Sequence, residues 1–283
     1  MENSKMLHVG VQNSEYQYKQ SANTLFRFMP ELKFLIEAIE KMQLFPRYVE
    51  ESVEYLGIRY GGEPIRKILL PMLCFCDINL HRLPAHVEGN GRDDSGYGKY
   101  GIGLEKEWCE EKGLQPITYL NENSESKRLL QTALNRSFEL EYNGNLDPSI
   151  EEYLDCIITQ LALSKPLKGT MKKGETEIFK NFHDEKEWRY LPNLSDTTMP
   201  SFKNDVLDPE LQNSIMNNDL SDSLKTTPGA PLTLTMEAVK YIFVHTIEDR
   251  NKMLEVLKNK FDIDEALLLA SKIIVYNQIV KDW

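Results

Sequence analysis

The feature that most constrains this chain is an uninterrupted apolar run near residue 70. The run extends from Ile68 to Cys76 and stops abruptly at Asp77. An apolar run of this length with polar residues at both ends is typical of a strand that is buried on both faces. We therefore predict a buried strand at 68–76, whose last residues bring Cys76 and Asp77 to an edge of the fold.

A polar loop and a glycine-rich strand are predicted after this run. The loop covers residues 81–96 and contains two histidines. Gly98, Gly101 and Gly103 then follow one another closely. A glycine leaves the face of a strand bare, so another backbone or a flat ligand can approach it. The pattern predicts that a binding site forms around this strand.

The rest of the chain alternates between predicted strands and helices. Strand-like segments occur near residues 24, 68, 99, 116, 186, 241 and 272. Apolar residues at helical spacing predict helices at 30–42, 124–138, 148–164 and 246–261, with a further helical turn at 264–270. Ser124 and Thr246 are the expected capping residues of two of these helices.

Polar segments without periodicity separate these elements. We expect a flexible N-terminal arm at 1–21, a loop at 50–66 with at most a short helix, a break at 165–174 and a long loop at 193–230. The prediction is a single α+β domain over residues 22–283. It has a mixed β-sheet core, flanking helices and a helical insertion near 123–164.

The segment 186–191 alternates in a way that separates its side chains onto two faces. Trp188 and Tyr190 are expected to face the core, and Glu187 and Arg189 the opposite side, where a cleft could lie. An alternative is that Glu187 pairs with Arg189 or with Lys186 on a solvated strand face.

Composition limits the compartment and the partners. The chain has 283 residues and four cysteines, and no apolar run approaches the roughly 20 residues that span a bilayer. No signal-peptide core follows the N-terminus, so we expect a cytoplasmic protein with reduced thiols and no membrane partner. The net charge of −11 does not attract nucleic acid.

Two further classes of site receive little support. A nucleic-acid acceptor would need a local basic patch, for which Lys165, Lys168, Lys172 and Lys173 are the candidates, although a solvated loop explains them better. We expect no metal site, because Cys74 and Cys76 have no second ligand pair nearby and the acidic pair at 93–94 has no matching carboxylate. A metal-dependent nuclease is therefore disfavoured.

The order of these segments resembles a known family. A cysteine-phenylalanine strand that ends in Asp77, a histidine-containing loop and the sequence YGKYGIGLEKEW at 97–108 resemble the AbiGi family of abortive phage-infection proteins. That family is commonly described as the antitoxin half of a phage-resistance pair. The same order is more distantly similar to the DarT-like ADP-ribosyltransferases. The likeness covers roughly residues 22–195.

The resemblance to the transferases implies an ADP-ribosyltransferase-like fold and NAD as substrate. Glu187 would be the catalytic carboxylate, which stabilises the positive charge on the ribose as the nicotinamide leaves. Arg27 stands where the family usually has a histidine in its first strand, and it would clamp the cofactor. The residues expected to contact NAD are Arg27, Phe28, Cys76, His86, Tyr97 and Tyr100.

Two functions from different classes follow from these likenesses. Our main prediction is an anti-phage protein that transfers ADP-ribose from NAD to a nucleic acid or protein acceptor. The alternative is a non-catalytic antitoxin that binds and neutralises a co-encoded toxin through its acidic surface. Glu187 discriminates between the two, because only the transferase requires that carboxylate in an open cleft. The histidines and tyrosines also have a structural alternative, since each can simply pack or cap.

Overall fold

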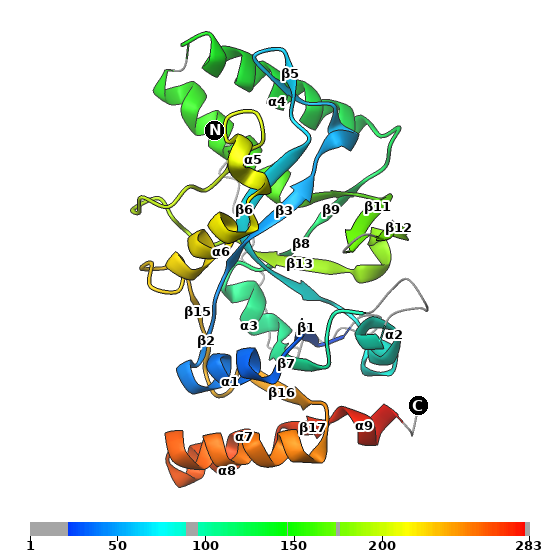
Figure 1. Cartoon of the computed structure of the whole chain (residues 1–283), viewed down its shortest axis with the longest axis vertical. Coiled ribbons are helices and arrows are strands. Elements are labelled where there is room, and N and C mark those ends of the chain that lie inside the picture. Colours follow the sequence, from blue (N-terminus) through cyan, green and yellow to red (C-terminus); the bar gives the residue numbers. More distant parts are fainter. Residues whose placement is uncertain (1–21, 89–95, 146, 174–175, 281–283) are drawn as a thin grey trace, which may run out of the picture.

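The computed structural model describes residues 22–88, 96–145, 147–173 and 176–280, which form a sheet between two helical ends (Figure 1). The predicted N-terminal arm at 1–21 lies outside the described residues. One end consists of α4 (Glu125–Tyr142) and α5 (Pro148–Ala162), and the other contains α7 (Ile247–Lys260) and α8 (Ile263–Ala270). Ser124 caps α4 and Thr246 caps α7, as predicted.

All seven strand segments expected from the sequence belong to the central sheet. The strand order is β17-β16-β7-β1-β6-β13-β8. In that order the strands are Ile273–Val275, Val239–Val244, Tyr100–Glu105, Thr24–Met29, Lys67–Cys76, Glu187–Tyr190 and Gln115–Pro116. Neighbours are antiparallel except β16 and β17, which are parallel. The predicted mixed sheet core of an α+β protein is therefore confirmed.

Strand β6 connects two regions of the sheet, which explains its apolar run. Its first half pairs with β3 (Arg47–Ser52) and β14 (Lys203–Asn204). Its second half pairs with β13, and Cys76 at its end pairs with β1. Because helices and loops cover both of its faces, nearly every residue of β6 is buried, and a polar side chain would lose its hydration there.

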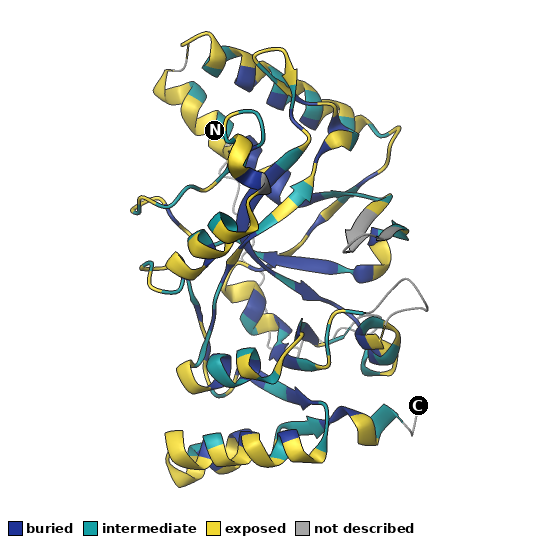
Figure 2. Cartoon of the chain, in the orientation of Figure 1, coloured by how far each residue is buried: buried dark blue, intermediate teal, exposed yellow. Residues whose placement is uncertain are grey.

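The helices pack against the sheet in separate hydrophobic cores. The first core contains residues of α1 (Leu32–Lys41), α3 (Lys106–Glu111), α7 and α8 packed on β1, β7 and β16. The second packs α4 and α5 against β6. A smaller aromatic core joins β1 and β16 to α2 (Leu83–Glu88) and α9 (Tyr276–Ile279). Buried residues follow the central strands, and exposed ones line the outer faces of the helices (Figure 2).

The prediction of a loop at 50–66 is wrong. Residues 47–52 form strand β3 along β6, residues 54–56 form a 3₁₀ helix, and β4 (Arg59–Tyr60) pairs with β5 (Glu63–Pro64). Strand β3 contains the adjacent glutamates Glu50, which is exposed, and Glu51, so its composition resembles that of a loop. The partner strand β6 supplies the hydrogen bonds and the apolar contacts that this segment lacks by itself.

The predicted break at 165–174 is also wrong. Residues 164–166 form β10, which pairs in parallel with β9 (Thr118–Leu120). Strands β11 (Lys168–Lys173) and β12 (Thr176–Asn181) then form an antiparallel pair. The single strand expected at 116–120 is split, because β8 joins the central sheet while β9 joins β10.

Two other polar segments contain more structure than expected. The long loop predicted at 193–230 holds β14, a 3₁₀ helix at 209–212 and α6 (Ser214–Ser223). It is anchored by Leu194, Leu211, Leu224 and Ala230, which pack near β3. Helix α6 has few apolar residues, so its sequence shows no helical period. The loop expected at 81–96 begins with a 3₁₀ helix and α2, while residues 89–95 lie outside the described part.

Candidate functional site

Strand β13 buries both residues that were expected to face a cleft. The side chain of Glu187 is 7% exposed and that of Arg189 is fully buried. The alternation of the strand is as predicted, since Trp188 is buried in the core on the other face. The prediction that Glu187 faces an open cleft is wrong, because other elements cover this face and pair with its charges.

Arg189 is held by three acceptors. Its Nε donates to Glu187 Oε1 at 2.7 Å, and its two terminal nitrogens donate to the carboxylate of Glu51 on β3. Nη1 also donates to the carbonyl oxygen of Ala162 at the end of α5, at 2.5 Å. A planar guanidinium suits this fork of two carboxylates. Arg189 thus joins β13 to β3 and to α5.

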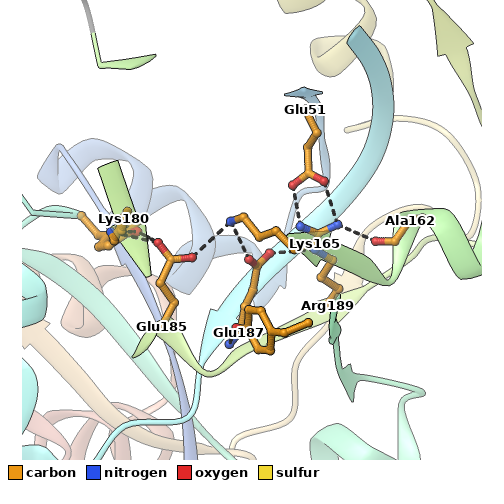
Figure 3. Close-up of polar contacts among 9 residues, drawn as sticks. Glu51, Ala162, Lys165, Lys180, Glu185, Glu187 and Arg189 are labelled. Carbon is orange, nitrogen blue, oxygen red and sulfur yellow. Dashed lines mark hydrogen bonds and ion pairs between the residues drawn. The ribbon is translucent and has the colours of Figure 1, made fainter. Parts of the chain in front are cut away.

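Lys165 on β10 connects Glu187 to a second carboxylate (Figure 3). Its Nζ lies 3.0 Å from Glu187 Oε2 and 3.1 Å from Glu185 Oε2. Lys180 on β12 approaches the other oxygen of Glu185 at 2.9 Å. These contacts and those of Arg189 define what we call the charge network. It comprises Glu51, Lys165, Lys180, Glu185, Glu187 and Arg189, so its three positive and three negative charges balance.

The network shifts the pKa values of four of its members. Burial alone would raise the pKa of Glu187, but the charges of Arg189 and Lys165 lower it to about 2. The pKa of Glu185 is likewise lowered by Lys165 and Lys180 against the effect of burial. Despite their burial, the neighbouring carboxylates raise the pKa of Lys165 and of Arg189. Glu187 is therefore ionised and fully compensated at neutral pH.

Three of the other predicted site residues lie in one row that reaches this network. The ring of His86 is stacked on Tyr97 with 4.3 Å between ring centroids, and it lies 5.5 Å from the ring of Phe28. The hydroxyl of Tyr97 donates to Glu185, and Lys180 donates to the same hydroxyl at 2.5 Å. The structure therefore brings Phe28, His86 and Tyr97 to the edge of the charge network.

The remaining predicted residues lie apart from this row. Tyr100 donates its hydroxyl to Asp249 Oδ2 of α7 at 3.2 Å. Cys76 is buried, its Sγ lies 3.4 Å from the carbonyl oxygen of Phe26, and burial raises the pKa of its thiol well above the ordinary value. Arg27 donates from Nη1 to the carbonyl oxygen of Cys74 at 3.0 Å and lines a pocket beside α1.

The glycine-rich strand β7 is covered by the protein's own aromatic rings. A Cβ on Gly101 would lie 2.8 Å from the ring of Phe28, and one on Gly103 would lie 2.9 Å from the ring of Phe26. The close approach expected from these glycines does occur, but side chains of β1 make it. The face on which a dinucleotide was expected to lie is filled by those rings.

Sequence reasoning missed most partners in the charge network. Lys165 was considered only as part of a basic patch, and Glu51 only as part of a loop. Lys168 is exposed, whereas the side chains of Lys172 and Lys173 lie outside the described part. The alternation of Glu187 with Arg189 was the one local signal, and it gave their pairing as the alternative to a cleft. The partners come from β3 and β10, which were not expected to be strands.

A second buried ion pair lies at the end of β6. Lys106 Nζ is 2.6 Å from Asp77 Oδ2, with side-chain exposures of 2% and 9%. Asp77 also accepts the backbone N–H of Ala22 at 3.1 Å. The pair fixes the start of α3 to the edge of the sheet where Asp77 was expected.

The described residues offer neither a metal-binding cluster nor a membrane-spanning helix. They contain no group of three or more His, Cys, Asp or Glu side chains placed to hold a metal ion. No helix in the described part is long and apolar enough to cross a lipid bilayer.

Comparisons with known proteins agree on one family. Residues 42–222 match the family model described as "Putative abortive phage resistance protein AbiGi, antitoxin". The chain is 34% identical over 257 residues to the abortive phage resistance protein AbiGi of Lactococcus lactis subsp. cremoris, covering 86% of this chain and 100% of that protein. No solved structure matches the chain, so the transferase-like architecture stays a prediction. The extent of both matches shows that the chain belongs to the AbiGi family of abortive phage resistance proteins.

Proposed function

We propose that this chain acts in abortive phage resistance as an antitoxin, which binds and neutralises a co-encoded toxin without catalysis of its own. The family description names an antitoxin, and an antitoxin implies a toxin partner. The net charge of −11 suits a partner with a basic surface, because complementary charge speeds association and selects the partner. This was the alternative function drawn from the sequence.

The main support for this proposal is that the carboxylate of Glu187 is buried and already paired. One carboxylate oxygen is 2.7 Å from Arg189 Nε and the other is 3.0 Å from Lys165 Nζ. A carboxylate that stabilises a developing positive charge on a ribose must face that carbon. Glu187 would have to break two buried ion pairs to do so, and its removal from them would leave Lys165 and Arg189 with uncompensated charge. The network is better suited to hold β13, β10 and β3 together.

The packing on β7 supports the same proposal. The rings of Phe26 and Phe28 fill the glycine face that the transferase hypothesis reserved for NAD. The ring of Phe28 also packs beside the ring of His86, which gives both residues a packing role. These contacts favour a binding protein in which the glycine-rich segment and the histidine segment serve the fold.

The experiment combines toxin neutralisation with an assay for NAD chemistry. The co-encoded partner is expressed from an inducible promoter, alone or with this chain, and growth is followed. We expect the partner alone to arrest growth and the chain to relieve the arrest. The purified proteins should co-elute from a sizing column, and labelled NAD should transfer no label to protein, RNA or DNA.

Variants at position 187 separate the two hypotheses. Glu187→Gln should still relieve growth arrest when circular dichroism shows that it is folded at the assay temperature. The matched control is Glu139→Gln, at an exposed carboxylate on α4 that pairs with the exposed Arg136. Label transfer by the wild type that disappears in folded Glu187→Gln would overturn the antitoxin proposal. The NAD-dependent transferase, with Arg27 as clamp, stays a prediction that this assay decides.

A further inference from the structure

A pocket of about 340 Å³ lies between the end of β1, helix α1, β2 (Gln43–Leu44) and the end of α6. Its apolar lining includes Phe34, Ala38, Leu44 and Phe45. The volume is at the lower end of the range for small-molecule sites, which run from about 300 to 1,000 Å³. The pocket therefore suits a ligand with a short apolar body.

Arg27 lines this pocket and is incompletely paired. Its one hydrogen bond in the described structure goes from Nη1 to the carbonyl oxygen of Cys74, and no described carboxylate forms an ion pair with it. Burial lowers the pKa of its guanidinium. A guanidinium has five N–H donors in a fixed fork, so donors remain for a planar acceptor with two oxygens.

The two cations at the rim of the pocket, Arg47 and Lys225, differ in how far their charge is compensated. Arg47 donates to the neutral amide oxygen of Asn218 at 2.7 Å. Lys225 is compensated, because it lies 3.1 Å from Asp222 and 3.9 Å from Glu37. Glu37 also lines the pocket, but its carboxylate already pairs with Lys41 at 2.9 Å. The two arginines, which form no ion pair in the described structure, therefore keep positive charge at this pocket, in a chain whose net charge is −11.

The chemistry of the lining favours a carboxylate over a phosphate. One guanidinium lies among apolar walls, and the second is at the exposed rim. A carboxylate is satisfied by a two-donor fork, whereas a phosphate brings more charge and more oxygens that the apolar walls would leave without donors. The apolar part of the ligand would gain free energy by burial against Phe34 and Leu44.

We propose that this pocket binds an apolar carboxylate, with the carboxylate on Arg27 and the apolar body against the side chains of α1 and β2. The carboxylate can belong to a free molecule or to the C-terminal residue of a peptide chain. This inference does not rest on the antitoxin proposal, since it requires neither a toxin nor NAD.

Binding is tested with a matched pair of probes on the full chain. The dissociation constants of 3-phenylpropionate and of 3-phenylpropanamide are measured by NMR titration. They share an apolar body and differ in charge. We expect the carboxylate to bind at least about tenfold more tightly, since a hydrogen bond to a charged group is worth more than one to a neutral group. Equal affinities for the two probes, or no binding of either, would overturn the proposal.

Variants locate the site, and peptides identify the source of the carboxylate. Arg27→Gln should remove the preference for the acid, while Arg136→Gln, at an exposed arginine of α4, should retain it. N-acetyl-Ala-Phe with a free carboxylate, compared with its amide, shows whether a chain end binds better than the free acid. The preference measured on the wild type stands whether or not Arg27→Gln folds. Displacement of the acid by NAD at similar concentration would contradict the proposal, since it would make this a dinucleotide site.

Discussion

Two arginines flank strand β6 at the same residue and have opposite surroundings. Arg189 on β13 is the register partner of Cys74, and Arg27 on β1 donates to the carbonyl oxygen of that residue. Arg189 is fully buried and binds two carboxylates and a carbonyl. Arg27 has the single carbonyl bond and lines a pocket.

The difference shows how to distinguish a charged side chain that holds the fold together from one that is available to bind a ligand. Removing an arginine from water costs free energy, which Arg189 recovers through ion pairs and hydrogen bonds. For the half-buried Arg27, a single hydrogen bond to a carbonyl recovers only part of that cost, and burial lowers the pKa of its guanidinium. A ligand with a negative charge could supply further compensation at Arg27, whereas Arg189 is already paired with two carboxylates.

Removal of Arg189 is expected to give the largest effect. Arg189→Met leaves the carboxylates of Glu51 and Glu187 buried without this partner, so the free energy of unfolding should fall by about 3–5 kcal/mol. Urea unfolding followed by circular dichroism measures the change. The control Arg136→Met, at an exposed pair, should change it by less than about 0.5 kcal/mol. A loss at Arg189 no larger than the control would mean that water reaches both carboxylates.

Glu187 should make stability depend on pH in a defined window. Its pKa is about 2 in the folded protein and about 4.3 in an unfolded chain. Because the folded value is lower, the contribution is present above pH 4.3 and is lost as the pH falls toward 2. The loss is about 3 kcal/mol. Urea unfolding of the wild type and of Glu187→Gln from pH 2 to 6 should give curves that converge at low pH. Parallel curves would contradict the assigned pKa.

The connection through Lys165 predicts coupling between two substitutions. Lys165→Met removes the cation between Glu185 and Glu187, and it should lower the free energy of unfolding by roughly 1–3 kcal/mol. In the Glu187→Gln background the same change should cost less, because one of the two carboxylates is already neutral. A double-mutant cycle at neutral pH measures this difference. Strict additivity would show that the two side chains do not interact in solution.

Arg27 is expected to give the smallest effect on stability. In Arg27→Gln the amide can still donate to the carbonyl of Cys74, and no carboxylate loses a partner, so the free energy of unfolding should change by less than about 1 kcal/mol. The measurement is the same urea titration. If the free energy of unfolding fell as far as in Arg189→Met, both arginines would hold the fold together and the contrast between them would be wrong.

Seven strands of the central sheet could be predicted because their signals are local. The apolar run of β6 and the alternation of β13 are properties of adjacent residues, and the structure places both strands in the sheet. Segments with polar outward faces were missed. Strand β3 carries Glu50 and Glu51, and α6 contains few apolar residues, so both become ordered only through contacts with other elements.

The candidate site was predictable only in part. The shared face of Glu187 and Arg189 follows from the strand period, and so does their pairing as an alternative to a cleft. The elements that cover this face could not be foreseen. Glu51 is 138 residues from Arg189 in sequence, and Lys165 is 22 residues from Glu187. Phe28 and Phe26 were likewise not expected to fill the glycine face of β7.

The sequence by itself determined seven strands of the sheet, the two helix caps at Ser124 and Thr246 and the face on which each charge of β13 lies, because these depend on side-chain period and neighbouring residues. Only the tertiary structure decided that Glu187 is compensated and Arg27 is not. Charge pairing depends on distances of 3–4 Å between groups on different elements, and burial by those same elements sets the strength of each interaction. The same residue type is therefore a structural link on one side of β6 and a candidate binding group on the other.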